Sequence, residues 1–476
     1  MSKEIKTKLY YIMNPGCGWC KKSDPVVEAL VSDGYNIITL DVSKPDQAKT
    51  AREVTSEHGL QCGTPHFVDA ETGNSVCGFR EKDVLQKWAD GEEMPAPPAP
   101  QKLPPNQEKP SGPSKRHVKL EYIWVDGHGT RNVRSKSRYE ILNFGTEDTP
   151  AGMDEVFTQI PEWSYDGSST RQADPKNSDL VLRPVRMFGN PLDTTQQLVS
   201  YIVLCEVYNA DGTPHETNDR YNLRDYLYSV EDDLGLVTSV EQEFMIWDPI
   251  SDWPSGWGWD NKEDMGLHPA QDGKSYCGVG GGASHRWLAD SHVQLCGRAG
   301  IRIAGTNAEV LKSQWEFQTS PSDPLTCADT LWVSRFLLQR LAEQRSLDIN
   351  YDPKPFKEYN GSGGHINFST QSMREDGGEV MFQSIIDALE ENHDKVMDSY
   401  GEDNKKRLTG KHETSKYNKF TSGSSDRTAS VRIPLSTTRN WRGHIEDRRP
   451  AANMDPYAAL LSLTKVVSNA HAGVLA

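Results

Sequence analysis

Two glutamates stand two residues apart in the middle of the chain, in the sequence Val-Glu-Gln-Glu-Phe at 240–244. The surrounding residues 236–247 are rich in β-branched and aromatic side chains and contain no Gly or Pro, which predicts a β-strand. Because side chains alternate between the faces of a strand, Glu241 and Glu243 project from the same face. Neighbouring carboxylates repel each other unless a cation lies close by. The pair therefore indicates a metal site.

Further candidate ligands follow on other predicted strands, and Asn367 and Ser369 share a face with one of them. These ligands are Glu309, Glu316, His365 and Glu446. A single Glu on a strand usually faces solvent, and a lone His is usually structural. Taken together, however, the residues lie in segments too hydrophobic to form a plain surface. An oxygen-rich set of this kind favours hard divalent cations.

Arginines accumulate towards the C-terminal end, at Arg407, Arg427, Arg432, Arg442, Arg448 and Arg449. Carboxylates mixed with arginines are consistent with a simple lattice of salt bridges. The same mixture is what phosphoryl transfer needs, since metals bridge the phosphates and arginines neutralise the phosphoryl oxygens.

Residues 1 to about 90 predict the element order βαβαββα, with Cys17-Gly-Trp-Cys20 where the first strand meets the first helix. A helix N-terminus stabilises a thiolate, so Cys17 is placed to be a nucleophile and Cys20 to be the resolving thiol. The alternatives are a structural zinc site that also uses Cys62 and Cys77, or two inert cysteines. Cys62 is otherwise expected to be a small buried residue or a third redox thiol.

This N-terminal part resembles the thioredoxin/glutaredoxin superfamily. Thr64-Pro65 matches its cis-proline loop, and the segment 78–84 is similar to the one before the last glutaredoxin helix. The resemblance implies a thioredoxin-like α/β fold, thiol–disulfide exchange at Cys17 and Cys20 beside Pro65, and glutathione or a thioredoxin-type protein as the thiol partner.

Length and composition limit the possible classes. A chain of 476 residues predicts two or three domains, and eight prolines between Pro95 and Pro113 indicate a linker over 91–116. A net charge of −16 argues against nucleic acid or an anionic membrane as the main partner. Short apolar runs, no signal core and eight scattered cysteines predict a cytoplasmic protein without a disulfide framework.

Beyond the linker, a β-rich region begins near residue 118, with strands predicted at 118–125 and 199–208 and a helix at 223–234. Strands then alternate with helices predicted at about 284–298, 323–345, 376–395 and 455–470. Residues 247–276 are rich in Trp, Gly, Asp and Pro and are expected to be irregular.

Residues 117–476 resemble type II (eukaryotic-type) glutamine synthetase. The motifs occur in the family's order and at about its spacing. They are Trp-Ser-Tyr-Asp-Gly-Ser-Ser-Thr at 163–170, Glu-Gln-Glu-Phe at 241–244, Tyr-Cys-Gly-Val-Gly at 276–280, Ala-Gly-Thr-Asn-Ala-Glu-Val at 304–310, Gln-Trp-Glu-Phe-Gln at 314–318, and the segments 360–370, 408–415, 429–434 and 446–450. The resemblance implies a β-grasp subdomain at 117–210 and, at 211–476, a catalytic domain with a curved antiparallel sheet and flanking helices.

The same resemblance implies roles for individual residues. One divalent metal would be held by Glu243, Glu309 and Glu316, and a second by Glu241, His365 and Glu446. The catalytic residues would be Asp166, which binds ammonium and takes its proton, Glu413 on a closing flap, Arg427 and Arg448. Glutamate and the phosphoryl group would be bound by Asn360, Gly361, Arg407, Arg427 and Arg448. The nucleotide would be bound by Asn367, Ser369 and Arg432.

The implied reaction joins ammonia to the γ-carboxylate of glutamate with ATP as substrate and two to three Mg²⁺ or Mn²⁺ ions per site. The implied assembly is a decamer of two pentameric rings with active sites between subunits. The sequence departs from the family pattern at Gly364, Asp426, Leu435 and residues 422–425, which leaves methylamine or another amine open as the acceptor. The alternative function is a redox or scaffold protein whose synthetase-like body is inactive.

Overall fold

The chain forms two compact units, residues 1–110 and 111–476. The computed structural model describes residues 8–58, 64–92, 115–146, 151–193, 198–230, 234–257, 271–280, 283–375 and 377–475, with side chains described as far as 471. Cys62 and most of the expected linker lie outside these residues. No helix within the described ranges is long and apolar enough to cross a membrane.

The first unit is a four-stranded sheet with helices, in the order βαβαββα that the sequence predicts. Its elements are β1 (Leu9–Met13), α1 (Gly18–Ser32), β2 (Ile37–Asp41), α2 (Pro45–Glu57), β3 (His66–Asp69), β4 (Ser75–Cys77) and α3 (Lys82–Ala89). The strand order is β2-β1-β3-β4, and β1 pairs parallel to β2 and antiparallel to β3. One core packs Tyr11 and Phe67 against Trp88 of α3, and a second packs Ile12 and Val68 against α2. The sheet is therefore buried on both faces.

The second unit begins with a five-stranded sheet in the order β6-β5-β9-β8-β7. Its elements are β5 (Lys115–Val125), β6 (Val133–Asn143), α4 (Met153–Phe157), β7 (Trp163–Asp166), the 3₁₀ turn η1 (Ser168–Thr170), β8 (Asp179–Gly189) and β9 (Val199–Tyr208). One face carries its own core, whereas Ile123, Ile202 and Leu204 on the other face pack against Cys296 and Phe336 from later helices. Apolar contact therefore joins this sheet to the rest of the unit.

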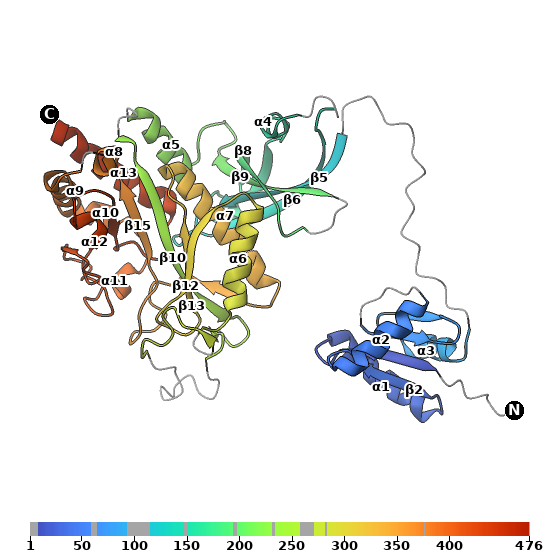
Figure 1. Cartoon of the computed structure of the whole chain (residues 1–476). Coiled ribbons are helices and arrows are strands. Elements are labelled where there is room, and N and C mark those ends of the chain that lie inside the picture. The colour runs from blue at the N-terminus through green and yellow to red at the C-terminus, as the bar shows by residue number, and fades with distance from the viewer. Residues whose placement is uncertain are drawn as a thin grey trace. The chain divides into compact units, whose positions relative to one another are not determined.

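A larger sheet of nine strands follows the path β12-β13-β10-β15-β18-β17-β16, with β11 and β14 also paired to β10. Figure 1 shows β10 and β15 side by side through this unit. Its strands and helices are α5 (Asp219–Ser229), β10 (Val237–Asp248), β11 (Trp253–Pro254), α6 (Arg286–Arg298), β12 (Ile303–Ala308), β13 (Gln314–Thr319), α7 (Pro324–Glu343), β14 (Asp348–Asn350), β15 (Gly364–Ser369), α8 (Gln371–Glu375), α9 (Glu379–Glu391), α10 (His393–Met397), α11 (Asn404–Arg407), β16 (Ser422–Ser424), β17 (Val431–Ile433), α12 (Leu435–Thr438), β18 (Ile445–Asp447) and α13 (Pro456–Leu475).

The two faces of β10 have different environments. Val240, Phe244 and Ile246 lie in the main core together with residues of α6, α7, α9 and α13. Gln242 shares their face, is fully buried, and accepts hydrogen bonds from the guanidinium of Arg335 on α7. Since side chains alternate along a strand, the glutamates at 241 and 243 are left on the opposite face, away from the helices.

Two predicted helices differ from the structure. The helix expected at 223–234 is α5, which begins at Asp219 because the side chain of Asn218 accepts the backbone N–H of Tyr221 at 3.1 Å. The single helix expected at 376–395 is instead α9 and α10, separated at Asn392. Both predictions were wrong at positions where a cap, not the apolar spacing, sets the boundary.

The hydrogen bonds between Arg335 and Gln242, on the helix-facing side of β10, predict that loss of Arg335 strongly lowers the stability of the fold. Arg335 is 3% exposed and also donates to the carbonyl oxygens of Ala452 and Met454, each at 2.9 Å. We expect Arg335→Met to lower the free energy of unfolding by about 3 kcal/mol or more, because it leaves buried acceptors unpaired. Arg340→Met on the same helix, where the arginine pairs with the exposed Glu343, should change it by about 0.5 kcal/mol or less. Equal urea midpoints for the two variants would contradict this reading.

Candidate functional site

The central strand β10 distributes its two glutamates between its two neighbours. Glu243 pairs in register with Glu316 of β13, and Glu241 pairs in register with His365 of β15. Because β13 and β15 lie on opposite sides of β10, one two-residue step along the strand places the carboxylates in two separate clusters.

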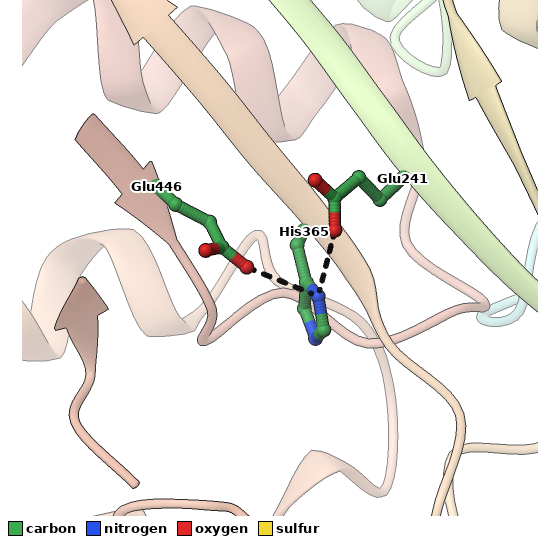
Figure 2. Close-up of side chains that lie close together, drawn as sticks. All are labelled: Glu241, His365 and Glu446. Carbon is green, nitrogen blue, oxygen red and sulfur yellow. Dashed lines mark ion pairs between the residues drawn. The ribbon is translucent and has the colours of Figure 1, made fainter. Parts of the chain in front are cut away.

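The first cluster consists of Glu241, His365 and Glu446, whose ligand atoms lie within 4.8 Å of one another. Figure 2 shows the imidazole of His365 between the two carboxylates, which come from β10 and β18. Its Nδ1 lies 3.6 Å from Glu241 Oε2 and 3.5 Å from Glu446 Oε1, and it is a buried atom without a hydrogen-bond partner. Burial and the nearby Arg448 lower the pKa of His365, which keeps the ring neutral. A neutral imidazole and two carboxylates suit a divalent cation.

The second cluster consists of Glu243, Glu309 and Glu316, again with ligand atoms within 4.8 Å of one another. Burial, together with the charge of neighbouring carboxylates, raises the pKa of Glu243 to about 7, that of Glu309 to about 8 and that of Glu316 to about 9. Three crowded carboxylates resist ionising together unless a cation compensates their charge. This cluster therefore also suits a hard cation.

Backbone and amide donors hold the Glu243 carboxylate in place. Its Oε2 accepts the N–H of Gly363 at 2.8 Å and the side-chain amide of Gln314 at 3.3 Å. A Cβ at Gly363 would lie 2.5 Å from both Arg407 Nη2 and His365 Nε2, so the close approach requires glycine. The sequence did not identify these two donors as site residues. The position of Gln314 on the same strand face as Glu316 was the available signal.

Arginines surround the first cluster. The two oxygens of Glu446, which is fully buried, bind different guanidinium groups, with Arg448 Nη1 2.6 Å from Oε1 and Arg432 Nη1 2.6 Å from Oε2. Arg407 Nη2 donates to His365 Nε2 at 3.0 Å and to the carbonyl oxygen of Arg448 at 3.1 Å. The cluster thus combines negative ligands with fixed positive charge.

A cavity opens between these groups and brings most of the expected substrate residues together. Its lining includes the expected residues Glu243, Glu309, Asn360, Gly361, His365, Arg407, Glu413 and Arg448. Gln314, His412 and Thr414 also line it and were not expected. Glu413 and His412 both have positive φ, 58° and 54°, so the segment that carries them turns sharply where it lines the cavity.

The expected nucleotide residues already have partners within the chain. Asn367 donates to Glu241 Oε1 at 2.8 Å, and the hydroxyl of Ser369 accepts from Arg374 at 3.0 Å. The backbone oxygen of Arg427 accepts from Arg448 Nε at 3.2 Å.

Asp166 lies elsewhere, at the end of β7 in the five-stranded sheet. Its carboxylate accepts the N–H and hydroxyl of Ser168 and the hydroxyl of Ser169, which lower its pKa to about 2. Across the described part of the chain, no hydrogen bond or ion pair joins it to either cluster. One chain thus does not bring Asp166 into this cavity.

The N-terminal thiols form a second candidate site. Cys17 caps α1, and its sulfur accepts the backbone N–H of Cys20 at 3.4 Å and donates to the carbonyl oxygen of Thr64 at 3.3 Å. Hydrogen bonds from Cys20 lower the pKa of Cys17, whereas burial raises the pKa of Cys20. The Thr64–Pro65 bond is cis. Cys17 and Cys20 are free thiols, while Cys77 is disulfide-bonded and so is not available as a zinc thiolate.

Comparison with known proteins identifies the larger unit. A family profile described as "Glutamine synthetase, catalytic domain" matches residues 216–397. A glutamine synthetase of Emericella nidulans is 41% identical over 342 residues, which cover 71% of this chain and 89% of that protein. This chain belongs to the glutamine synthetase family. Its relatives therefore support glutamate–ammonia ligation as its catalytic function.

Other comparisons agree with this family. Glutamine synthetase root isozyme A of Pisum sativum is 39% identical over 348 residues, covering 72% of this chain and 92% of that protein. The solved structure of Plasmodium falciparum glutamine synthetase matches with a TM-score of 0.57 at 16% identity, over 75% of this chain and 72% of that one. At that identity the structural match shows the fold alone, a curved sheet with flanking helices.

The crowded carboxylates predict a pH-dependent response to divalent ions. Folding raises the pKa values of these three glutamates, so the folded protein binds more protons than the unfolded chain between about pH 5 and 9. Its stability without ions therefore falls as pH rises across that range. Bound protons compete with Mg²⁺ for these carboxylates. We therefore expect Mg²⁺ to raise the thermal midpoint more at pH 9, where fewer protons are bound, than at pH 6.

The matched variants are Glu316→Gln within the cluster and Glu343→Gln on the exposed side of α7. The first should weaken the pH dependence of the Mg²⁺ shift, and the second should leave it unchanged. A Mg²⁺ shift that is the same at both pH values in the unmodified protein would exclude the cluster as the binding site.

Proposed function

We propose that residues 117–476 ligate ammonia to the γ-carboxylate of L-glutamate through a γ-glutamyl phosphate, giving glutamine, ADP and phosphate. The observation that carries this proposal is the pair of adjacent carboxylate clusters held between arginines. The proposed domains are a β-grasp subdomain at 117–210 and a catalytic domain at 211–476. They follow the linker expected at 91–116, whose last two residues, Lys115 and Arg116, belong to β5.

The clusters fit two divalent cations, Mg²⁺ or Mn²⁺. Glu243, Glu309 and Glu316 would hold one near the glutamate, and Glu241, His365 and Glu446 one on the nucleotide side. Support comes from the unpartnered Nδ1 of His365 and from the raised pKa values of the three crowded glutamates. Bound there, the ions would offset the negative charge of the phosphates.

The arginines serve the first half of the reaction. A carboxylate oxygen is a poor leaving group, so the γ-carboxylate is first phosphorylated by ATP and phosphate is then displaced. Arg407, Arg427 and Arg448 bind the glutamate and the transferring phosphoryl group, and Arg432 lies on the nucleotide side with Asn367 and Ser369. Their fixed charge stabilises the phosphoryl oxygens during transfer.

Ammonia capture is assigned to Asp166, with Glu413 closing the site against water. The low pKa of Asp166 keeps it ionised, which suits an ammonium ion. Because Asp166 has no contact with the clusters of its own chain in the described residues, it acts in a neighbouring subunit's site. This supports a homo-oligomer, which the family resemblance implies to be a decamer of two pentameric rings.

Loss of Glu243 tests the ligase proposal. We expect Glu243→Ala to reduce γ-glutamyl product formation from glutamate, ATP, Mg²⁺ and ammonia by at least about 10³-fold, because the ligand set with Glu309 and Glu316 and the contact with the Gly363 N–H both depend on this carboxylate. Chromatographic measurement of glutamine gives the result, with the exposed Glu343→Ala as control. Absence of turnover in the unmodified chain, or full turnover in Glu243→Ala, would refute the proposal.

Residues 1–90 are proposed to be a thioredoxin/glutaredoxin-like thiol–disulfide domain that regulates the ligase. The cap position and lowered pKa of Cys17 and the burial of Cys20 support it. In the body, Cys205, Cys296 and Cys327 are buried with raised pKa values, whereas Cys277 is exposed. Cys277 is therefore the accessible target thiol among the described residues.

The proposed thiol–disulfide exchange restores the Cys277 thiol and oxidises Cys17 and Cys20. The Cys17 thiolate attacks a disulfide between Cys277 and a small thiol such as glutathione, and the departing thiolate takes a proton. Cys20 then closes the Cys17–Cys20 disulfide and releases the second thiol. Two molecules of glutathione reduce that disulfide and become glutathione disulfide.

We expect oxidised glutathione to inhibit the ligase, and Cys17→Ser to slow its reactivation by reduced glutathione at least about tenfold, because the nucleophile is lost. Cys277→Ser should remove the inhibition itself, while Cys296→Ser, at a buried thiol, should keep it. The rate at which glutamine formation recovers is measured for each variant and for the unmodified chain. Identical curves for Cys17→Ser and the unmodified chain would show that the domain does not act on the ligase.

A further inference from the structure

Two hydrogen bonds hold the backbone of the loop that precedes β15. The N–H of Ser362 donates to the carbonyl oxygen of Pro353 at 3.0 Å, and the side-chain amide of Gln314 donates to the carbonyl oxygen of Gly361 at 2.9 Å. Asn360, the first residue of this loop, is 9% exposed and lines the cavity. The direction in which its side-chain amide faces therefore decides what the cavity presents to a ligand.

Gln271 sets that direction. The backbone N–H of Asn360 donates to Gln271 Oε1 at 2.9 Å, and Gln271 Nε2 donates to Asn360 Oδ1 at 2.5 Å. A backbone N–H can only donate, so the Gln271 oxygen must face it and the Gln271 nitrogen must face the Asn360 side chain. That nitrogen in turn needs an acceptor, so Asn360 must turn its oxygen towards Gln271. One unambiguous donor thus orients both amides.

The consequence is that the Asn360 side chain presents only N–H donors to the cavity that it lines. Asn360 Nδ2 has no hydrogen-bond partner among the described residues, and its two N–H groups are left for a ligand. We infer that Gln271 is a positioning residue that makes Asn360 a donor to the α-carboxylate of the amino-acid substrate. This inference rests on the proposed function and adds Gln271, which lies between β11 and α6 in the chain.

The α-carboxylate is the group that matches. The γ-carboxylate is the reacting group and belongs beside the clustered glutamates, Glu243 and Glu309, and their ion. An α-ammonium group needs an acceptor, which the oriented Asn360 side chain does not offer. A carboxylate accepts both N–H groups in charge-assisted hydrogen bonds.

The test uses a substitution of Gln271 that turns the side-chain amide of Asn360 around. In Gln271→Glu, one carboxylate oxygen still accepts the Asn360 N–H, but the other can only accept, so Asn360 turns its NH₂ group towards it and its oxygen towards the cavity. Gln271→Glu combined with Asp272→Asn keeps the charge of the segment constant, because Asp272 is the adjacent exposed carboxylate, paired with Lys274. Asp272→Asn alone is the matched control.

Three probes separate the contacts: glutamate, glutarate, which lacks the α-amino group, and 4-aminobutyrate, which lacks the α-carboxylate. Calorimetric titration of the full chain with Mg²⁺ and ADP present gives Kd for each. In the double variant we expect Kd for glutamate and for glutarate to rise about tenfold or more, and Kd for 4-aminobutyrate to change less than about twofold. In turnover, KM for glutamate should rise while kcat and KM for ATP stay unchanged.

Equal weakening of all three probes would overturn the inference, since it would show a merely structural role for Gln271. Selective weakening of 4-aminobutyrate would also overturn it, because Asn360 would then contact the ammonium group. The binding measurements need no turnover. If the double variant weakens glutamate and glutarate but not 4-aminobutyrate, while the unmodified chain makes no glutamine, the ligase proposal is refuted and this inference is supported.

Discussion

The repulsion between buried carboxylates is the constraint on which the larger unit depends. Glu241, Glu243 and Glu316 lie on adjacent strand positions of one sheet face, and burial penalises the charge of Glu243 and Glu316. Such a face is tolerated only when every negative group has a compensating partner. The arginine pairs at Glu446 and the backbone N–H at Glu243 supply part of that compensation, and two cations would supply the rest.

The opposite face of β10 makes this arrangement rigid. Gln242 lies between the two glutamates in sequence, yet it points into the helix-packed core and is bound by Arg335. The same arginine also binds backbone carbonyls of the segment between β18 and α13. One buried guanidinium therefore fixes the central strand relative to the last part of the chain, which carries Glu446 and Arg448.

The thiols of the chain divide by environment. Cys17 lies at a helix N-terminus with donors to its sulfur, which favours the thiolate. The buried thiols at 205, 296 and 327 have raised pKa values and pack as small apolar groups. Among the free cysteines of the described residues, Cys17 and Cys277 are the two that are not buried.

Local spacing in the sequence predicted a strand at 236–247, which the structure shows as β10 (Val237–Asp248). It also predicted the shared face of Glu241 and Glu243 and the element order of the first unit, because two-residue alternation and helix-start signals are local properties. Helix ends set by caps, as at Asn218 and Asn392, escaped a prediction based on apolar spacing.

The sequence by itself determined which residue types lie on each strand face, together with the motifs of the family. The family resemblance implied that Glu243 groups with Glu316 and Glu241 with His365, but only the tertiary structure shows the strand pairing that brings these side chains together. Only the tertiary structure shows that Gln271 orients Asn360. These features depend on pairing between segments far apart in the chain, and no local pattern of side chains records which strands become neighbours.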